Sequence, residues 1–426
     1  MTAAATVQRA QFRQLFVLIA VAFIDMIGFM LVLPVLPFYA LKLHATPVQV
    51  GWIFAAFSIA QLISAPLWGR VSDRYGRRPA LLIGLLASAA AYTVFGFADT
   101  LWLLFLSRFV QGAGGGTTGV AQAYVADTVR PSDRARALGW LSAATSAGVV
   151  VGPILGTFAS RLGTEGPGLI AAGLCVLNAI FAWYWLPESR VAQPAGEAQP
   201  KRSVWGPALH AFLNPRLPVS RLIWIYGAGM LAFASLNAVL PLYLADEFGV
   251  NERSFGYFLT YFGILSLVIR VVLLGPVVDR FGERFTVRIG CVALIVGFLL
   301  YPAVGNLWLL AILVMPLVPI GTALLFPSTT SMISGRVDRR ELGVTMGVAQ
   351  TFGGVARSVA PVLSTRIFQD LGHAWPFVAA AGIVGVVSLL AVRIGPAPEA
   401  TPVPAPAPAP SAPAAAAAAT IDTPVA

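Results

Sequence analysis

GRVSDRYGRR, residues 69–78, returns later in the chain as GPVVDRFGER, residues 275–284. Each copy lies between two apolar blocks. A shorter pair, Asp133-Arg134 and Asp338-Arg339, lies at matching places further along the chain. The repeat therefore indicates two halves of the same architecture.

The composition places the chain in a membrane. Of 426 residues, 58% are hydrophobic and 11% are charged, against about 25% charged in a soluble domain. Mean hydropathy is +0.80. This balance excludes a soluble enzyme, and we expect the protein not to be an enzyme at all, since no nucleophile, base and orienting group fall together.

Apolar blocks of about 20 residues recur along the chain, and a helix of that length crosses the hydrocarbon core of about 30 Å once. The fold class expected is an all-α polytopic membrane protein with twelve transmembrane helices in two pseudo-symmetric six-helix bundles. The expected spans are 13–37, 49–69, 79–98, 101–125, 137–160, 168–187, 218–244, 254–276, 286–303, 307–334, 342–369 and 374–393.

The blocks divide into four parts. We expect an N-terminal bundle over 1–187, a polar cytoplasmic linker over 188–217 and a C-terminal bundle over 218–395. Residues 396–426 are Pro-Ala repeats and an Ala run, a composition typical of a disordered tail.

Lys and Arg lie mostly on one side of this topology. Of the 28, 21 fall in the N-terminus, the even-to-odd loops, the linker and the tail. Because positive loops stay cytoplasmic, both termini are expected in the cytoplasm. Few Lys with many Arg, Ala and Pro are typical of a GC-rich bacterial genome, so we expect the protein in the plasma membrane of a bacterium, the inner membrane. The net charge of +10 is then a topology signal, and no nucleic-acid partner is expected.

Residues for metal or cofactor chemistry are scarce. Cys175 and Cys291 lie inside apolar blocks and the three His lie outside them. No Gly-Lys-Ser/Thr run follows the glycines of 112–116. We therefore expect no metal, cofactor or ATP site, and a proton gradient as the energy source.

Asp25 is the one acidic residue in the interior of a span. A charge there costs about 2.5–3.5 kcal/mol, so it should face the protein interior or a water-filled cavity. Arg108 falls at a similar depth in the fourth span. One hypothesis is that burial and Arg108 together set the Asp25 carboxyl group to exchange a proton near neutral pH; the alternative is a permanent ion pair joining two spans.

The repeated loop has residue types that suit a latch. Two glycines permit a tight helix turn, and Arg77 is placed to bridge Asp73 to Asp127 when the cytoplasmic side closes. The alternative is that its arginines are topology charges alone. The candidate latch residues are Gly69, Asp73, Arg74, Gly76, Arg77, Arg78 and Asp127, with Gly275, Asp279, Arg280, Gly282 and Arg284 in the second copy.

Other spans carry weaker signals. Gly148, Gly152 and Gly156 recur every four residues beside Pro153, forming a small-residue face against which a helix packs closely. Arg357 either binds an anionic group or donates to carbonyl groups at a helix break. Arg270 is close enough to a span end to reach the interface.

Several of these stretches resemble the major facilitator superfamily, in particular its drug:proton antiporter branch of tetracycline-type efflux proteins. Residues 69–78 match the superfamily signature, 25–37 resemble the first-helix motif, 108–112 the motif whose arginine is linked to proton coupling, and 148–156 the antiporter motif. The resemblance covers residues 12 to 393. It implies proton coupling through Asp25 and Arg108, a latch at 69–78 and a seam between the halves at 148–156.

The resemblance also implies that spans 1, 4, 7 and 10 line a central path. Candidate cavity residues on these spans, together with Arg357, are Gly28, Phe29, Gln111, Gln122, Tyr226, Phe233, Asn237, Thr322 and Phe326. Aromatic rings with a few amides suit an amphipathic ligand.

Three functions are compatible with these residues. The first is a proton-driven, monomeric exporter of hydrophobic or amphipathic small molecules in the lipid bilayer. The second is a carrier of a metabolite, possibly an anion, suggested by three arginines against one acid inside the spans. The third is a non-transporting receptor or scaffold whose tail recruits partners.

Overall fold

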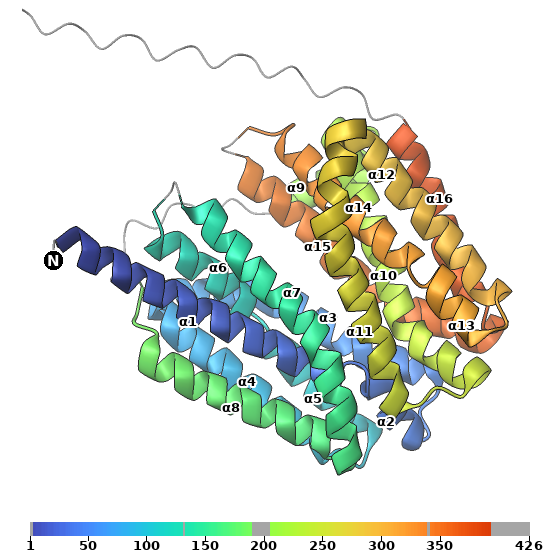
Figure 1. Cartoon of the computed structure of the whole chain (residues 1–426), viewed down its shortest axis with the longest axis horizontal. Helices are drawn as coiled ribbons and strands as arrows, with labels where there is room; N and C mark the ends of the chain where they lie inside the picture. The colour runs from blue at the N-terminus through green and yellow to red at the C-terminus, as the bar shows by residue number, and fades with distance from the viewer. Residues whose placement is uncertain (1–2, 131–132, 190–204, 339–340, 393–426) are drawn as a thin grey trace, which may run out of the picture. The chain divides into compact units, whose positions relative to one another are not determined.

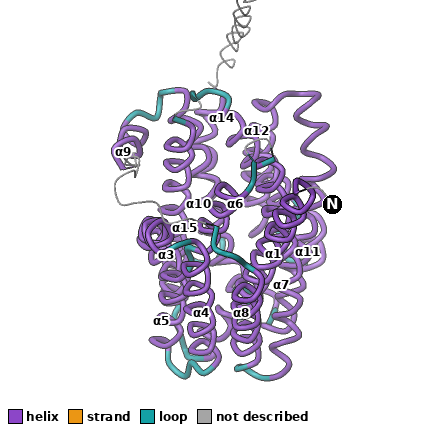
Figure 2. Tube along the Cα trace, turned by 90° about the vertical axis from the view of Figure 1, so that its left-hand side faces the viewer, coloured by secondary structure: helices purple, strands orange, loops and turns teal. Residues whose placement is uncertain are grey.

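The computed structural model describes residues 3–130, 133–189, 205–338 and 341–392, which are almost wholly helical (Figure 2). The chain divides into two units, Met1–Gly395 and Pro396–Ala426. The expected tail and residues 190–204 of the expected linker lie outside the described residues. Everything below concerns the first unit.

The helices of the first half are α1 (Ala3–Val32), α2 (Leu36–Lys42), α3 (Pro47–Tyr75), α4 (Arg77–Gly96), α5 (Leu101–Gly114), α6 (Thr117–Thr128), α7 (Arg134–Ala159) and α8 (Gly166–Trp185). Those that follow are α9 (Trp205–Leu213), α10 (Pro218–Phe248), α11 (Glu252–Val268), α12 (Leu274–Leu300), α13 (Leu307–Leu309), α14 (Leu317–Ser334), α15 (Leu342–Leu371) and α16 (Trp375–Val392). Figure 1 shows their arrangement.

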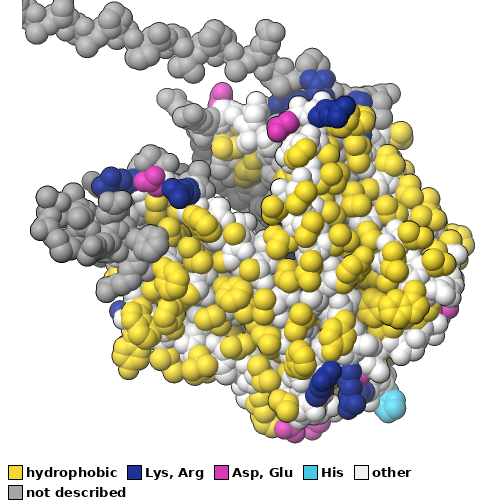
Figure 3. All heavy atoms as spheres, viewed as in Figure 1, with side chains coloured by type: hydrophobic (Ala, Val, Ile, Leu, Met, Phe, Trp, Pro, Cys, Tyr) yellow, Lys and Arg dark blue, Asp and Glu magenta, His cyan; other side chains and the backbone are white. Residues whose placement is uncertain are grey.

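Eight helical stretches in the described part of the chain are long and apolar enough to cross a membrane. One of them, Glu252–Ala303, is 52 residues long and turns at Gly282, whose φ of 78° is not helical, so it crosses twice. Adding α5–α6, α15 and α16 gives the twelve crossings of the expected fold class. Figure 3 shows apolar side chains over the middle of the visible face and charged side chains toward its ends.

Two spans expected as single helices are each made of two. The first breaks between α1 and α2 at residues 33–35, because Pro34 has no N–H to continue the helix. The fourth breaks at Gly115 and Gly116, between α5 and α6. Spans eight and ten stay continuous but contain π-helical segments, Ile269–Leu273 and Leu310–Val314.

Packing between the two halves runs mainly through α3 with α15 and α7 with α11. We call the ends near α9 and Gly76 the α9 side, and the ends near residues 43–46 and 249–251 the opposite side. On the opposite side glycines bring backbones together: a Cβ on Gly51 would lie 2.7 Å from the Pro361 carbonyl oxygen. A Cβ on Gly256 would lie 2.6 Å from that of Pro153. The halves are therefore tightly joined there.

Candidate functional site

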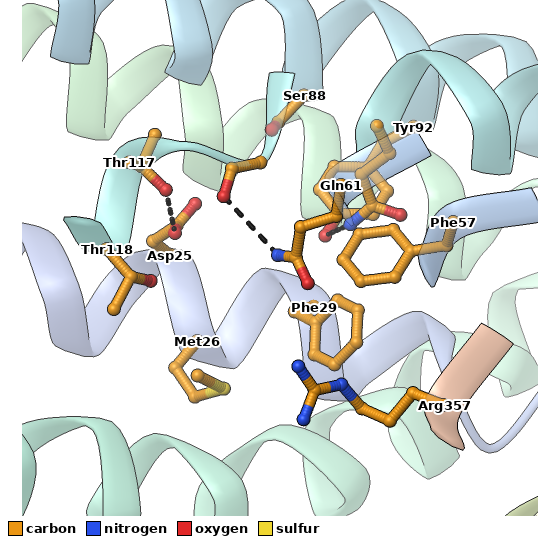
Figure 4. A pocket seen from close by; sticks show the side chains of 12 residues that line it. Asp25, Met26, Phe29, Phe57, Gln61, Ser88, Tyr92, Thr117, Thr118 and Arg357 are labelled. Atoms are coloured by element: carbon orange, nitrogen blue, oxygen red, sulfur yellow. Dashed lines mark hydrogen bonds between the residues drawn. The ribbon is translucent and has the colours of Figure 1, made fainter. Parts of the chain in front are cut away.

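Two cavities lie between the halves. The outer chamber, of about 550 Å³, reaches the α9 side, where Gly69, Ser72 and Arg77 line it. The inner pocket, of about 200 Å³, is lined from α1, α3, α4, α5, α6 and α15 (Figure 4). Both cavities are lined by Gln61, Gly115, Thr118 and Arg357. The two cavities therefore adjoin at these four residues.

Asp25 lines the inner pocket from the C-terminal third of α1. Its Oδ2 accepts a hydrogen bond from the Thr117 hydroxyl group at 3.1 Å. Figure 4 shows this pair at one end of the pocket, beside Thr118. This carboxylate therefore faces a cavity inside the protein, as a charged residue within a span should.

The break in the fourth span places Thr117. Three α3 side chains donate to carbonyl groups at the break: Ser64 to Gly112, whose oxygen also accepts the Gly115 N–H, the Trp68 indole N–H to Ala113, and Gln61 to Gly115. Because these carbonyl groups are satisfied, the helix can end and restart inside the protein. Restarting at Thr117 puts that hydroxyl group opposite Asp25.

Arg108 is buried on α5, with 1% of its surface exposed. Its guanidinium carbon lies 5.5 Å from the Tyr92 ring centre and 5.2 Å from that of Phe95. Within the described residues none of its three side-chain nitrogens has a hydrogen-bond partner, and it forms no ion pair with Asp25. Arg108 therefore does not lock α1 to α5 in this state.

Tyr92 on α4 is the residue between the two charges. It interacts electrostatically with both Asp25 and Arg108, and its hydroxyl oxygen accepts a hydrogen bond from the Gln111 amide. Asp25 and Arg108 thus do not contact each other, but both lie near Tyr92.

The glycine ladder of α7 packs on α1. A Cβ on Gly148 would lie 2.8 Å from the Met26 Cβ, and one on Gly152 2.4 Å from that of Met30. A Cβ on Gly156 would lie 2.3 Å from the Leu31 carbonyl oxygen. The expectation that these glycines form the seam between the halves is wrong, since their face meets a helix of the same half. The ladder instead fixes the part of α1 that carries Asp25.

Pro153 of the same motif does lie at the seam. Its carbonyl oxygen and the neighbouring Thr157 side chain are close to Gly256 of α11. Gly256 and Gly263, both on α11, are therefore the small residues that let α7 and α11 approach.

Arg357 of α15 reaches the inner pocket from the other half. Figure 4 shows its guanidinium group pointing toward Met26 and Phe29. The one hydrogen-bond contact of its side chain within the described residues is with the Met230 sulfur, at 3.9 Å. The alternative of a helix break at Gly353-Gly354 is wrong, because α15 is continuous there.

The remaining cavity candidates divide in two. Phe29 and Gln111 line the inner pocket and Gln122 lines the outer chamber. Gly28 packs under Tyr92 and Cys175. Those of the second half line neither cavity: Tyr226 contacts Phe326 behind Gln350 and Arg357, Phe233 contacts Phe262, Asn237 bonds the Phe233 carbonyl group, and Thr322 bonds the Val318 carbonyl group.

Sequence reasoning missed the contribution of α3, α4, the start of α6 and most of α15. Phe57, Gln61, Ser88, Tyr92, Thr117, Thr118, Gln350 and Thr351 line the two cavities. Polar residues spaced along spans two and eleven were the available signal.

The loop after α3 is held by ion pairs within the first half. Arg77 lies 2.8 Å from Asp73 and 2.9 Å from Asp127, and it donates to Ser72 at 2.7 Å. These bonds join α3, α4 and α6 while the outer chamber is present on the same side. They therefore stabilise one half and do not bridge the two.

Glu188, at the start of the expected linker, binds the backbone of this loop. Its carboxylate accepts the backbone N–H groups of Arg77 at 2.8 Å and Arg78 at 3.1 Å, at the start of α4. Gly76 has a φ of 104°, and a Cβ there would lie 2.5 Å from the Glu188 carboxylate. A glycine is required at this position for both reasons.

The second copy of the loop is organised differently. Asp279 and Arg280 are exposed, and within the described residues neither forms an ion pair. Arg280 covers the Phe281 ring, and Arg284 lies near Arg336. A Cβ on Gly275 or Gly282 would meet nothing within 4 Å.

Polar contacts close the opposite side between the halves. Lys42 of α2 forms an ion pair with Glu252 of α11 at 2.5 Å, and Arg161 donates to the Tyr257 hydroxyl group at 3.1 Å. Partial burial opposes ionisation of Glu252, but Lys42, its own backbone N–H and Arg253 outweigh this and hold its pKa below the usual value. Both pairs cross from one half to the other.

A charged pocket between two helical halves, closed at one end and reached from the other, defines a membrane transporter. Comparison with known proteins agrees with this class. The profile of the Major Facilitator Superfamily matches residues 18–272 and 222–421. The chain belongs to the Major Facilitator Superfamily and transports small molecules.

Its relatives include drug-resistance proteins. The chain is 30% identical over 406 residues to the class C tetracycline resistance protein of Escherichia coli, covering 91% of this chain and 98% of that protein. It is 28% identical over 379 residues to multidrug resistance protein 2 of Bacillus subtilis strain 168, covering 88% and 92%. The structure of the human organic anion transporter MFSD10 (TETRAN) shares the fold, with a TM-score of 0.67 and 23% identity, over 89% of this chain and 99% of that one.

Proposed function

We propose that the protein exports hydrophobic or amphipathic compounds in exchange for protons, by alternating access. The observation that carries the proposal is the Asp25 carboxylate in the wall of the inner pocket. Within the described residues it is the one acidic side chain that lines either cavity. The resistance proteins among the relatives support export of drug-like compounds.

Exchange follows if a proton and the substrate compete for Asp25. The titratable or charged groups around it are Tyr92 from α4, Cys175 from α8 and Arg357 across the pocket. Protonation cancels the carboxylate charge and so weakens its attraction for a cationic group on the substrate. One site can then bind either the proton or the substrate.

The orientation of the chain in the membrane determines the side to which the outer chamber opens. With the positive loops and both termini in the bacterial cytoplasm, the α9 side is cytoplasmic and this state is open inward. Reversal requires the Lys42–Glu252 contact on the opposite side to break and the outer chamber to close. We propose that the two bundles, 1–187 and 218–395, move as units of a monomer, with the 69–78 loop stiffening the first.

A second candidate, a carrier of an anionic metabolite, is favoured by one observation. Arg357 reaches both cavities and has no ion pair within the described residues. The name of the human organic anion transporter with the same fold is compatible with it. Such a carrier would take up its anion together with protons.

The test uses everted membrane vesicles from efflux-deficient cells and a panel of fluorescent dyes and antibiotics, tetracycline included. We expect at least one compound to be accumulated by vesicles with wild type, and both a protonophore and Asp25→Asn to abolish this at equal expression. Asp99→Asn, an exposed carboxylate on the opposite side, is the matched control and should transport normally. Undiminished transport by Asp25→Asn would refute the proposal.

A further inference from the structure

The inner pocket has opposite charges at its two ends. Asp25 comes from α1 at the end that holds Thr117, and Arg357 comes from α15 at the end that holds Phe29 (Figure 4). Within the described residues neither side chain forms an ion pair; Asp25 bonds a hydroxyl group and Arg357 contacts a thioether. A charged side chain removed from bulk water needs a partner of opposite charge. A bound ligand can supply such a partner to both Asp25 and Arg357.

The wall between these charges is largely aromatic. Phe29 and Phe57 contact each other with ring centres 5.0 Å apart, and the Arg357 guanidinium group lies beside Phe29. Met26 completes the apolar wall, while Gln61 and Gln111 add amide groups. The wall fits a flat, mostly apolar body with polar ends.

We propose that the preferred substrates are zwitterionic aromatic compounds, with a protonated amine at Asp25, an anionic group at Arg357 and the ring system against Phe29 and Phe57. This assignment rests on the proposed function, since it uses the same Asp25 carboxylate. It names the substrate class of that site.

Compounds with one charge fit less well. A cation leaves the Arg357 guanidinium group unpaired, and an anion lies in the same pocket as the ionised Asp25 carboxylate, which repels it. A zwitterion pairs both charges at once. The pocket therefore selects zwitterions over singly charged compounds because a singly charged compound leaves either Asp25 or Arg357 without a partner.

Zwitterion binding also accounts for release. When Asp25 takes a proton it no longer attracts the amine, and Arg357 alone holds the anionic end. The arginine lies in the second half and Asp25 in the first, so separation of the halves moves the two binding groups apart. Protonation and the conformational change then weaken the same ligand.

The experiment measures binding to detergent-purified protein by calorimetry, with two matched triplets. The first is 4′-(aminomethyl)biphenyl-4-carboxylic acid, its methyl ester and its N-acetyl amide. The second is the shorter 4-(aminomethyl)benzoic acid with the same two derivatives. Each triplet holds the ring constant and gives a zwitterion, a cation and an anion.

We expect at least one zwitterion to bind about tenfold more tightly than its ester and its amide, which is about 1.4 kcal/mol. Arg357→Gln should weaken zwitterion binding and abolish the difference between zwitterion and ester, because the ester no longer leaves a guanidinium group unpaired. Asp25→Asn should weaken zwitterion binding and abolish the difference between zwitterion and amide, because the carboxylate that repels the anion is gone. Arg270→Gln, an exposed arginine that lines neither cavity, should bind as wild type does.

Three results would overturn the assignment: equal affinity for zwitterion and ester, equal loss for both on Arg357→Gln, or no binding of either zwitterion. Proton movement is measured separately, in proteoliposomes with a pH-sensitive dye in the lumen. Charge-selective binding without proton movement would refute the exchange mechanism but not the substrate class. Proton exchange driven equally well by the esters would refute the class but not the mechanism.

Discussion

The Thr117 hydroxyl group donates to the Asp25 carboxylate at 3.1 Å and so joins the start of α6 to the C-terminal third of α1. Within the described residues this is the one hydrogen bond to the Asp25 side chain. The break between α5 and α6 is what brings the two residues together.

Loss of this bond should impair transport without unfolding the protein. Hydrogen bonds to charged groups contribute about 1.5–3 kcal/mol, so Thr117→Val should slow proton-coupled transport by about tenfold or more. Thr117→Ser keeps the hydroxyl group and should stay near wild type. Equal transport rates for the Val and Ser variants in everted vesicles would show that the bond has no role.

The two glycines of the 69–78 loop should differ in importance. A Cβ at Gly76 meets the Glu188 carboxylate and an unfavourable φ, whereas a Cβ at Gly69 meets nothing within 4 Å. Gly76→Ala should lower the melting temperature, because the bonds from Glu188 to the start of α4 are displaced. Gly69→Ala should leave it nearly unchanged in the same detergent. The reverse order would contradict this assignment.

Arg77 should stabilise the first half. Its side chain is 10% exposed and bonds two carboxylates and a hydroxyl group, so Arg77→Gln should destabilise the protein by about 1–3 kcal/mol. Arg74→Gln, an exposed neighbour over the Tyr75 ring, is the control and should have little effect. Thermal unfolding of the two variants in parallel makes the comparison.

The glycine ladder should be sensitive where it faces α1. Gly152→Ala would place a Cβ 2.4 Å from the Met30 Cβ, so α1 must move away from α7. Gly139 on the same helix has open space, and Gly139→Ala should be tolerated. Because Asp25 lies in the displaced part of α1, we expect the Gly152 variant to lose transport at normal expression; normal transport would show that α1 tolerates the shift.

The opposite side should open in acid. The pKa of Glu252 is lowered in the folded state, so the Lys42 pair stabilises the closed side above the usual carboxyl value and the contribution is lost as pH falls through the lower folded pKa. The pair is partly exposed, which limits its effect. A label-to-label distance between His44→Cys and Val250→Cys, in a variant without Cys175 and Cys291, should increase as the pH falls below the ordinary carboxyl range and through the lowered pKa of Glu252. With Glu252→Gln the distance should no longer change with pH.

The membrane crossings and the buried charge could be predicted from the sequence, because both depend on the free energy of placing side chains in lipid. Twelve crossings and a cavity-facing Asp25 follow because a long apolar block is stable only away from water, and a charge within a span only away from lipid. Thr117 and Gln61 were missed because a neutral polar residue in a span carries a much smaller penalty. The ladder's period predicted a packing face, but a period does not say which helix it meets. Glu188 was missed because its role depends on a contact with residues more than a hundred positions earlier.

The bonds from Gln61, Ser64 and Trp68 to the α5–α6 break have a consequence for how the molecule deforms. Because α3 holds these carbonyl groups, we expect the first half to move with little internal change. Within the described residues the π-helical segments, Ile269–Leu273 and Leu310–Val314, both lie in the second half. Because π-helical segments are rare and often mark functional positions, we expect the second half to bend at these two segments when the transporter changes state. The two halves, despite the repeated sequence, are therefore expected to contribute unequally to the conformational change.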